Sequence, residues 1–144
     1  MSSLKILIVD DNESDIFLLR NALDELGEDY HLVVLEDGEQ AIEFVDRHRV
    51  SPHAPEPCVI LLDLHLPKRD GLEVLRAIRR EPTISHIHVV LVTTSASPQQ
   101  EAAIRAVGAD LRVKPTRLSE FAKLASDLIE ICKSFGAAPI AAMR

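Results

Sequence analysis

Several features that mark whole classes of protein are missing from this sequence. No apolar run approaches the roughly 18 residues that a membrane-spanning helix needs, which excludes an integral membrane protein. Cysteine is rare, and the two residues present, Cys58 and Cys132, lack the CxxC spacing of zinc and redox sites. We therefore expect both cysteines to be small, buried apolar side chains.

Basic residues are also fewer than acidic residues. Lys and Arg number 16 against 23 Asp and Glu, so the formal net charge is −7. This charge disfavours a phosphate backbone as partner, and we expect the protein not to bind DNA. Residues 1–5 lead directly into an apolar, strand-like segment without the pattern of a secretory leader. We therefore expect a cytoplasmic protein in a reducing compartment.

What the sequence does contain is a regular alternation of strand-like and helix-like segments. Its 144 residues fit one domain, which we place at 1–135, with 136–144 as a tail. Short apolar runs predict strands, and apolar residues at helical spacing follow each run. The runs lie at 5–9, 31–35, 59–62, 88–92 and 110–113. This alternation predicts an α/β fold with a parallel sheet covered by helices on both faces.

Three further local patterns define loops and helix ends. The segment 47–57 is rich in Arg, His, Ser and Pro, which predicts an extended surface loop. The Asp70-Gly71 pair predicts a turn in which glycine supplies a positive φ. A long apolar stripe predicts a final helix over 118–135.

Chemically versatile side chains follow most of the predicted strands. Asp63 ends the most apolar strand, and Asp10 and Asp11 follow the first strand. Thr93 and Lys114 follow the last two strands in the chain. Because the carboxyl ends of parallel strands meet at one edge of a sheet, we expect these side chains to lie close together.

This set of side chains fits the needs of phosphoryl transfer. The carboxylates and nearby backbone carbonyls form an oxygen-only site of the kind that Mg²⁺ accepts. Asp63 is suited to attack phosphorus and hold an acyl phosphate, while the Lys114 ammonium offsets charge on the phosphoryl oxygens. Thr93 can donate its hydroxyl to one of those oxygens, and the resulting displacement would act as a switch.

The same motifs, taken in order, resemble the receiver domains of two-component response regulators. The resemblance covers essentially residues 4–135. The matching motifs are Asp10-Asp11, the segment LLDLHLP at 61–67, Asp70-Gly71, Thr93 and Lys114-Pro115. The resemblance implies a flavodoxin-like, doubly wound, five-stranded parallel sheet with strand order 2-1-3-4-5.

The resemblance also implies a role for each site residue. Asp63 would be the phosphoacceptor, phosphorylated by a sensor histidine kinase. Asp10 and Asp11 would hold Mg²⁺ together with Asp63, and the backbone carbonyl of His65 would be a further ligand.

Two more residues have roles by resemblance, and one position departs from the family. Thr93 would be the switch hydroxyl. Lys114 would bind the phosphoryl group, with a cis peptide bond to Pro115. Leu111 stands where the family commonly has an aromatic residue that moves with the switch.

A narrower likeness concerns the kind of partner. The Pro-Glu-Pro segment at 55–57, the run DLHLPKRDG at 63–71 and the helix start at 117–121 look like the stand-alone receivers of phytochrome-type histidine kinases. This likeness implies a bacteriophytochrome as partner kinase. Apolar Phe135 and Ile140 near the end of the chain suggest a homodimer, because a second subunit could cover them.

Three functions remain in competition at this point. The main hypothesis is a phosphorylation-controlled receiver, which catalyses only its own phosphorylation and slow dephosphorylation and signals by conformational change or phosphotransfer. The second is a receiver-fold interaction module that works without phosphate. The third is a phosphatase or phosphotransferase with an aspartate nucleophile, which is disfavoured because His65 replaces the second acid typical of such enzymes.

Overall fold

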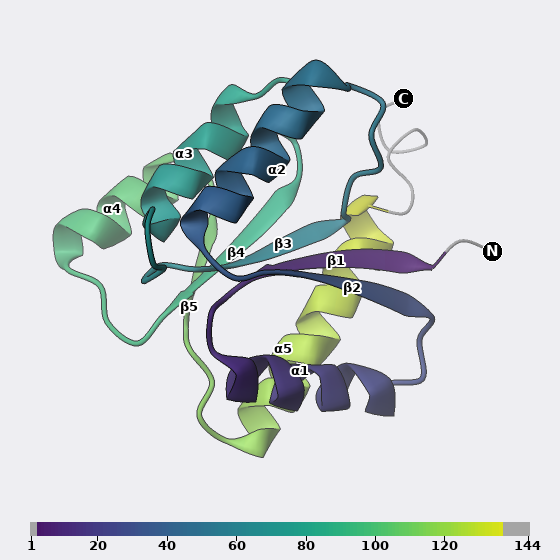
Figure 1. Cartoon of the computed structure of the whole chain (residues 1–144). Coiled ribbons are helices and arrows are strands. Elements are labelled where there is room, and N and C mark those ends of the chain that lie inside the picture. Colours follow the sequence, from purple (N-terminus) through teal and green to yellow (C-terminus); the bar gives the residue numbers. More distant parts are fainter. Residues whose placement is uncertain (1–2, 137–144) are drawn as a thin grey trace.

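Strands and helices alternate along residues 3–136, which are the residues that the computed structural model describes (Figure 1). The elements are β1 (Leu4–Val9), α1 (Glu13–Glu25), β2 (Tyr30–Leu35), α2 (Gly38–Val50), β3 (Val59–Asp63), α3 (Gly71–Arg80), β4 (His88–Thr93), α4 (Pro98–Ala106), β5 (Asp110–Val113), α5 (Leu118–Ile131) and a π-helical segment (Cys132–Gly136). Residues 137–144, the side chain of Phe135 and hence the predicted dimer contact lie outside the described part.

The strands form one parallel sheet in the order β2-β1-β3-β4-β5. This order confirms the predicted doubly wound, flavodoxin-like fold. Strand β3 is central: Leu61 pairs with Ile8 of β1, and Leu62 pairs with Leu91 of β4. The acids that follow β1 and β3 therefore emerge side by side at one edge of the sheet.

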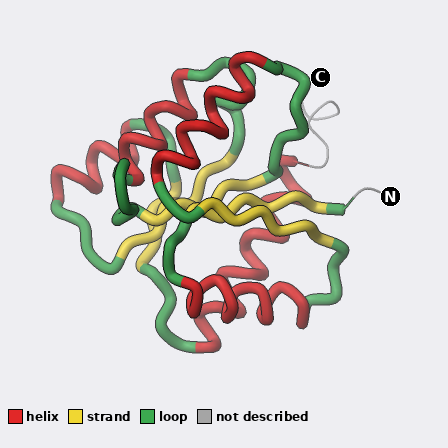
Figure 2. The backbone as a smooth tube through the Cα atoms, in the orientation of Figure 1, coloured by secondary structure: helices red, strands yellow, loops and turns green. Residues whose placement is uncertain are grey.

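Two helical layers enclose the sheet, with α2, α3 and α4 on one face and α1 and α5 on the other (Figures 1 and 2). Alternate residues of β3 serve the two faces. Ile60 and Leu62 pack with the first layer, and Val59 and Leu61 pack with the second. All of these side chains are buried, and each stabilises the fold by roughly 1.5–3 kcal/mol. The strand that carries Asp63 is thus anchored on both sides.

The Asp70-Gly71 pair does not form the predicted positive-φ turn. Asp70 is the N-cap of α3, and its carboxylate accepts a hydrogen bond from the Glu73 N–H. Gly71 begins that helix, while the positive φ of this loop, 70°, belongs to Lys68. Gly71 is required for a different reason, because a Cβ there would lie 2.3 Å from the carbonyl oxygen of Asp63.

The predicted loop at 47–57 is shorter than expected, because α2 continues to Val50. The first proline of this segment is Pro52, so the chain remains free to be helical before it. Basic residues at Arg47 and Arg49 fall in the last helical turn, where the helix dipole favours positive charge. At the other end of the chain, the predicted helix over 118–135 is α-helical only to Ile131.

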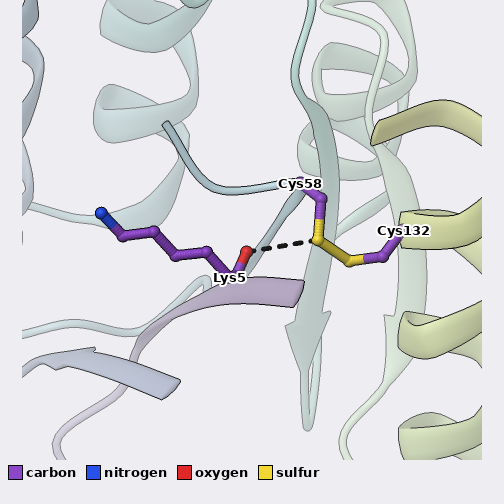
Figure 3. The surroundings of a disulfide bond; sticks show 3 residues. All are labelled: Lys5, Cys58 and Cys132. Atoms are coloured by element: carbon purple, nitrogen blue, oxygen red, sulfur yellow. Dashed lines mark hydrogen bonds between the residues drawn. A yellow bond between two sulfur atoms is a disulfide. The ribbon is translucent and has the colours of Figure 1, made fainter. Parts of the chain in front are cut away.

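Cys58 and Cys132 were expected to be small, buried apolar side chains, but they form a disulfide (Figure 3), and only Cys132 is fully buried. It joins the residue before β3 to the end of α5, 74 positions further along the chain. The Cys58 Sγ lies 3.2 Å from the carbonyl oxygen of Lys5, which also accepts the Cys58 N–H. Sequence spacing could not reveal this contact, since it depends on α5 returning across the sheet.

None of the helices within residues 3–136 is long and apolar enough to cross a membrane. The cytoplasmic location expected from the sequence stays a prediction.

Candidate functional site

A cluster of three carboxylates lies at the carboxyl edge of the sheet. Asp63 is the last residue of β3, and Asp10 and Asp11 follow β1 directly. One ligand oxygen from each residue lies within 4.8 Å of the other two. The side chains of Asp10 and Asp63 are buried, while Asp11 is exposed to solvent. The structure therefore brings together the three acids that the sequence predicted.

Backbone N–H groups fix the orientation of the two buried carboxylates. The Asn12 N–H donates to Asp10 Oδ1 at 2.9 Å, and the His65 N–H donates to Asp63 Oδ1 at 3.0 Å. Each acid therefore accepts from the residue two positions ahead. The loop after β3 is itself held, because the Leu64 N–H donates to the carbonyl oxygen of Val92 on β4.

Lys114 brings the one ammonium group that contacts this cluster within the described residues. Its Nζ lies 2.9 Å from Asp63 Oδ2 and 3.4 Å from Asp10 Oδ2. Burial by itself lowers the pKa of Lys114, but the hydrogen bond to Asp63 and the charges of Asp10 and Asp63 outweigh it. The net effect raises the pKa. Lys114 is therefore a fixed positive charge beside the predicted nucleophile.

Burial raises the pKa of Asp10, and the neighbouring charge of Asp63 adds to this effect. The Asn12 hydrogen bond and the Lys114 charge oppose the shift without cancelling it. Negative charge at this position is thus incompletely compensated by the protein. A divalent cation would supply the missing compensation.

Asp15 is a site residue that the sequence analysis missed. Its Oδ2 lies 3.2 Å from Lys114 Nζ, closer than either oxygen of Asp10. It sits in the first turn of α1, three residues after the N-cap Asn12. Helical side chains are directed toward the N-terminus of their helix, so an acid at this position can reach back to the strand ends. The available signal was an acid three residues after Asn12, because asparagine is a frequent helix N-cap.

Thr93 is buried at the end of β4, but its hydroxyl is turned toward its own loop. The Oγ1 donates to the carbonyl oxygen of Ser95 at 2.6 Å and accepts from the Ser95 N–H at 3.1 Å. The same carbonyl oxygen lies 3.0 Å from Nε2 of His65. The exposed side chain of His65 therefore borders the site and links the loops after β3 and β4.

The predicted cis bond between Lys114 and Pro115 was wrong, because every peptide bond among the described residues is trans. Trans is the preferred isomer even before proline, and Lys114 reaches Asp63 without the cis form. Leu111, at the position where an aromatic residue is common, is half-buried and packs against the core beneath α2, α3 and α4.

The donor set fits a hard divalent cation. Carboxylate oxygens are the ligands that Mg²⁺ and related ions prefer, and the exposed Asp11 leaves the cluster open to solvent on one side. Asp10, Asp11 and Asp63 are the residues that would hold such an ion. The arrangement supports chemistry in which negative charge develops near Asp63 and is neutralised by a cation and Lys114.

Comparison with known proteins agrees with this arrangement. The sequence model of the response regulator receiver domain matches residues 6–126, which include every residue of the cluster. This chain belongs to the response regulator receiver family. Its sheet order and helix arrangement are those of the family fold.

Receivers named for phytochrome signalling are among its relatives. The response regulator Rcp1 of Synechocystis sp. is 41% identical over 90 residues, which cover 62% of this chain and 61% of Rcp1. The crystal structure of the phosphorylated cyanobacterial phytochrome response regulator RcpA superposes with a TM-score of 0.82 and 31% identity. The superposition covers 96% of this chain and 99% of RcpA.

A third comparison concerns metal binding. The structure of Mn²⁺-bound Rcp1 superposes with a TM-score of 0.76 and 31% identity, covering 95% of this chain and 96% of that one. The response regulator Rcp1 thus binds a divalent cation, and this chain carries a cluster of three carboxylates of the kind that such ions accept.

Proposed function

We propose that this receiver accepts a phosphoryl group on Asp63 from a phosphohistidine of a sensor histidine kinase. The observation that carries the proposal is the position of Lys114 Nζ, 2.9 Å from Asp63 Oδ2 within a cluster of three acids. This pairing of a buried carboxylate with a fixed cation is what a phosphoryl acceptor needs, because phosphoryl transfer depends on positioning and charge neutralisation.

In the proposed reaction a carboxylate oxygen of Asp63 attacks phosphorus as the phosphorus–nitrogen bond of phosphohistidine breaks. The electron pair of that bond returns to the imidazole, and Asp63 becomes an acyl phosphate. Asp10, Asp11 and Asp63, with the backbone carbonyl of His65, would hold Mg²⁺. Bound there, the ion supplies positive charge against the phosphoryl oxygens.

Lys114 has the second role in this proposal. Its ammonium contacts Asp63 at 2.9 Å and would bind an oxygen of the phosphoryl group transferred to that carboxylate. Its backbone is fixed, because the Lys114 N–H donates to the carbonyl oxygen of Thr93 at 2.9 Å. The ammonium would therefore stabilise the transferred charge at little entropic cost.

Thr93 would convert phosphorylation into a conformational change. To donate to a phosphoryl oxygen, its hydroxyl must leave the Ser95 carbonyl that it now contacts at 2.6 Å. Loss of this bond would release the loop between β4 and α4, and the His65 contact with the same carbonyl would change with it. Signalling would follow from this released loop, or by passing the phosphoryl group on to another protein.

A phytochrome-type sensor kinase is the proposed phosphate donor. RcpA is described as a phytochrome response regulator, and it covers nearly the whole of this chain.

Self-association of the receiver as a homodimer is proposed as well. Sedimentation of the protein with and without residues 136–144 would test the predicted tail contact. An unchanged sedimentation profile would mean that residues 136–144 do not contribute to the dimer.

The phosphoacceptor is tested by mass. The purified protein is incubated with Mg²⁺ and acetyl phosphate, with and without chelator, and its intact mass is recorded. The proposal expects a Mg²⁺-dependent gain of one phosphoryl group that is lost in Asp63→Asn. Asp70→Asn is the matched control, because asparagine keeps the cap of α3 and the acid is not in the cluster.

Either of two results would contradict the proposal. Labelling of Asp63→Asn at the wild-type rate would mean that another residue is the acceptor. No labelling of the folded wild-type protein would favour the phosphate-independent interaction module.

A further inference from the structure

Lys114 has a carboxylate partner that lies outside the predicted metal cluster. The cluster consists of Asp10, Asp11 and Asp63. Asp15 is not part of it, yet its Oδ2 lies 3.2 Å from Lys114 Nζ. The ammonium therefore contacts two acids of the cluster and one acid that stands beside it.

The local structure fixes Asp15 in this place. Asn12 caps α1, and its Oδ1 accepts the Asp15 N–H at 3.1 Å. The N–H of the same Asn12 donates to Asp10 Oδ1 at 2.9 Å. The backbone of Asp15 is thus linked through one residue to a carboxylate of the cluster, and the side chain of Asp15 is only partly exposed, at 23%.

The two kinds of partner differ once a cation is present. A cation held by Asp10 and Asp63 draws on the negative charge of both, and their attraction for the Lys114 ammonium falls accordingly. Asp15 keeps its full charge for Lys114, because it does not belong to the cation's donor set. Without Asp15, less negative charge would offset the repulsion between the cation and the Lys114 ammonium.

We infer that Asp15 is a positioning residue, which holds the Lys114 ammonium beside Asp63 while the other three acids hold a cation. This inference rests on the proposed phosphoryl acceptance at Asp63. It gives Asp15 an effect on phosphoryl transfer that acts through Lys114 and not through contact with the phosphoryl group.

A purely electrostatic role for Asp15 predicts the opposite result. Acetyl phosphate and the transferred phosphoryl group are anions, so removing a nearby negative charge would help the donor to bind and react. A positioning role predicts slower transfer on removal of the same charge. The sign of the effect therefore separates the two explanations.

The first measurement needs no phosphate. The side-chain NH₃⁺ signal of Lys114 is recorded by ¹H–¹⁵N NMR at saturating Mg²⁺ in the wild-type protein, in Asp15→Asn and in Glu13→Gln. Glu13 lies in the same helical turn as Asp15. Glu13→Gln therefore removes one charge from that turn without removing an acid that contacts Lys114. The inference expects faster motion and faster hydrogen exchange of the ammonium in Asp15→Asn only. Equal signals in all three proteins would overturn it.

The second measurement is the rate of phosphorylation by acetyl phosphate at saturating Mg²⁺. Loss of one charge-assisted contact to a positioned group is expected to lower the maximal rate of Asp15→Asn by about tenfold. The donor concentration at half-maximal rate should not rise. Asp15→Glu should recover most of the rate, and Glu13→Gln should keep the wild-type rate.

The third measurement asks whether the effects of the Asp15 and Lys114 substitutions on the phosphorylation rate are additive. If Asp15 acts through the ammonium, adding Asp15→Asn to Lys114→Ala should cause no further loss of rate. A further tenfold loss in the double variant, or a faster reaction of Asp15→Asn alone, would overturn the inference. If wild-type protein accepts no phosphate, the proposed function fails, and the NMR comparison alone decides whether Asp15 holds Lys114.

Discussion

At the scale of single residues, the burial of Asp10 carries a cost for the stability of the fold. Burial raises its pKa above the ordinary value of 3.8, with Asp63 adding to the shift. Between pH 3.8 and the folded pKa, the folded protein therefore binds more protons than the unfolded chain. As pH rises from there through the folded pKa, this group lowers the free energy of unfolding of the metal-free protein.

Asp10→Asn should accordingly raise the free energy of unfolding of the metal-free protein at pH 7, because it removes an unfavourable charge. The gain should be smaller near pH 4, because protonation of Asp10 in the folded protein removes the same charge. The same change should weaken Mg²⁺ binding by about tenfold or more, because a ligand is lost. Urea denaturation with chelator at both pH values, and calorimetric titration with Mg²⁺, measure the two effects.

The control for this comparison is Asp29→Asn, which alters an exposed acid outside the cluster. It should leave both the stability and the Mg²⁺ affinity close to wild type. A stability gain for Asp10→Asn that is the same at both pH values would show that the charge of Asp10 is not its cause.

Most of the site could be predicted at this scale, because strand ends carry recognisable residues. Asp10, Asp63 and Lys114 each follow an apolar run, and parallel strands must bring their ends together. Asp15 could not be found in this way, since its approach to Lys114 depends on how α1 leaves β1. The direction of the Thr93 hydroxyl was equally hidden, because rotation about one bond decides it.

At the scale of whole elements, α3 packs closely against the end of β3 because Gly71, its first residue, has no side chain. The Gly71 N–H donates to the carbonyl oxygen of Leu64 at 2.8 Å. A Cβ on Gly71 would meet the Asp63 carbonyl oxygen at 2.3 Å and the Leu64 Cα at 2.7 Å. Both atoms belong to the backbone, so they cannot move aside without displacing the strand end.

Gly71→Ala is therefore expected to destabilise the fold by about 1–3 kcal/mol and to slow phosphoryl acceptance. Urea denaturation and the acetyl phosphate assay measure the two losses. Gly27→Ala is the matched control: its φ of 74° makes alanine strained, but nothing lies within 4 Å of the new Cβ. It should lose stability while accepting phosphate at the wild-type rate. Normal acceptance by Gly71→Ala would mean that the contact does not shape the site.

The elements themselves were predictable wherever the period of apolar residues agreed with flanking signals. The burial of β3 on both faces, for example, follows from its continuous apolar run. The end of α2 did not, because the polar residues after Val45 suit either a last helical turn or a loop. The role of Gly71 also escaped prediction, since the atoms that exclude a side chain come from β3.

At the scale of the whole molecule, the disulfide encloses the part of the chain that carries most of the site. Asp63, Thr93 and Lys114 all lie between Cys58 and Cys132, which are 74 positions apart. Closing a loop of this length restricts the unfolded chain, and loop-closure entropy gives a stabilisation of about 4 kcal/mol. That amount is a large share of the total stability of a small domain.

Reduction should thus lower the free energy of unfolding by about 4 kcal/mol, while the folded protein still accepts phosphate, because noncovalent contacts hold the site. Urea denaturation with and without dithiothreitol measures the loss. The double variant Cys58→Ala/Cys132→Ala should have the lower stability under both conditions. If reductant has no effect on wild type, and thiol titration of the unfolded protein finds both cysteines free, the bond does not form in solution.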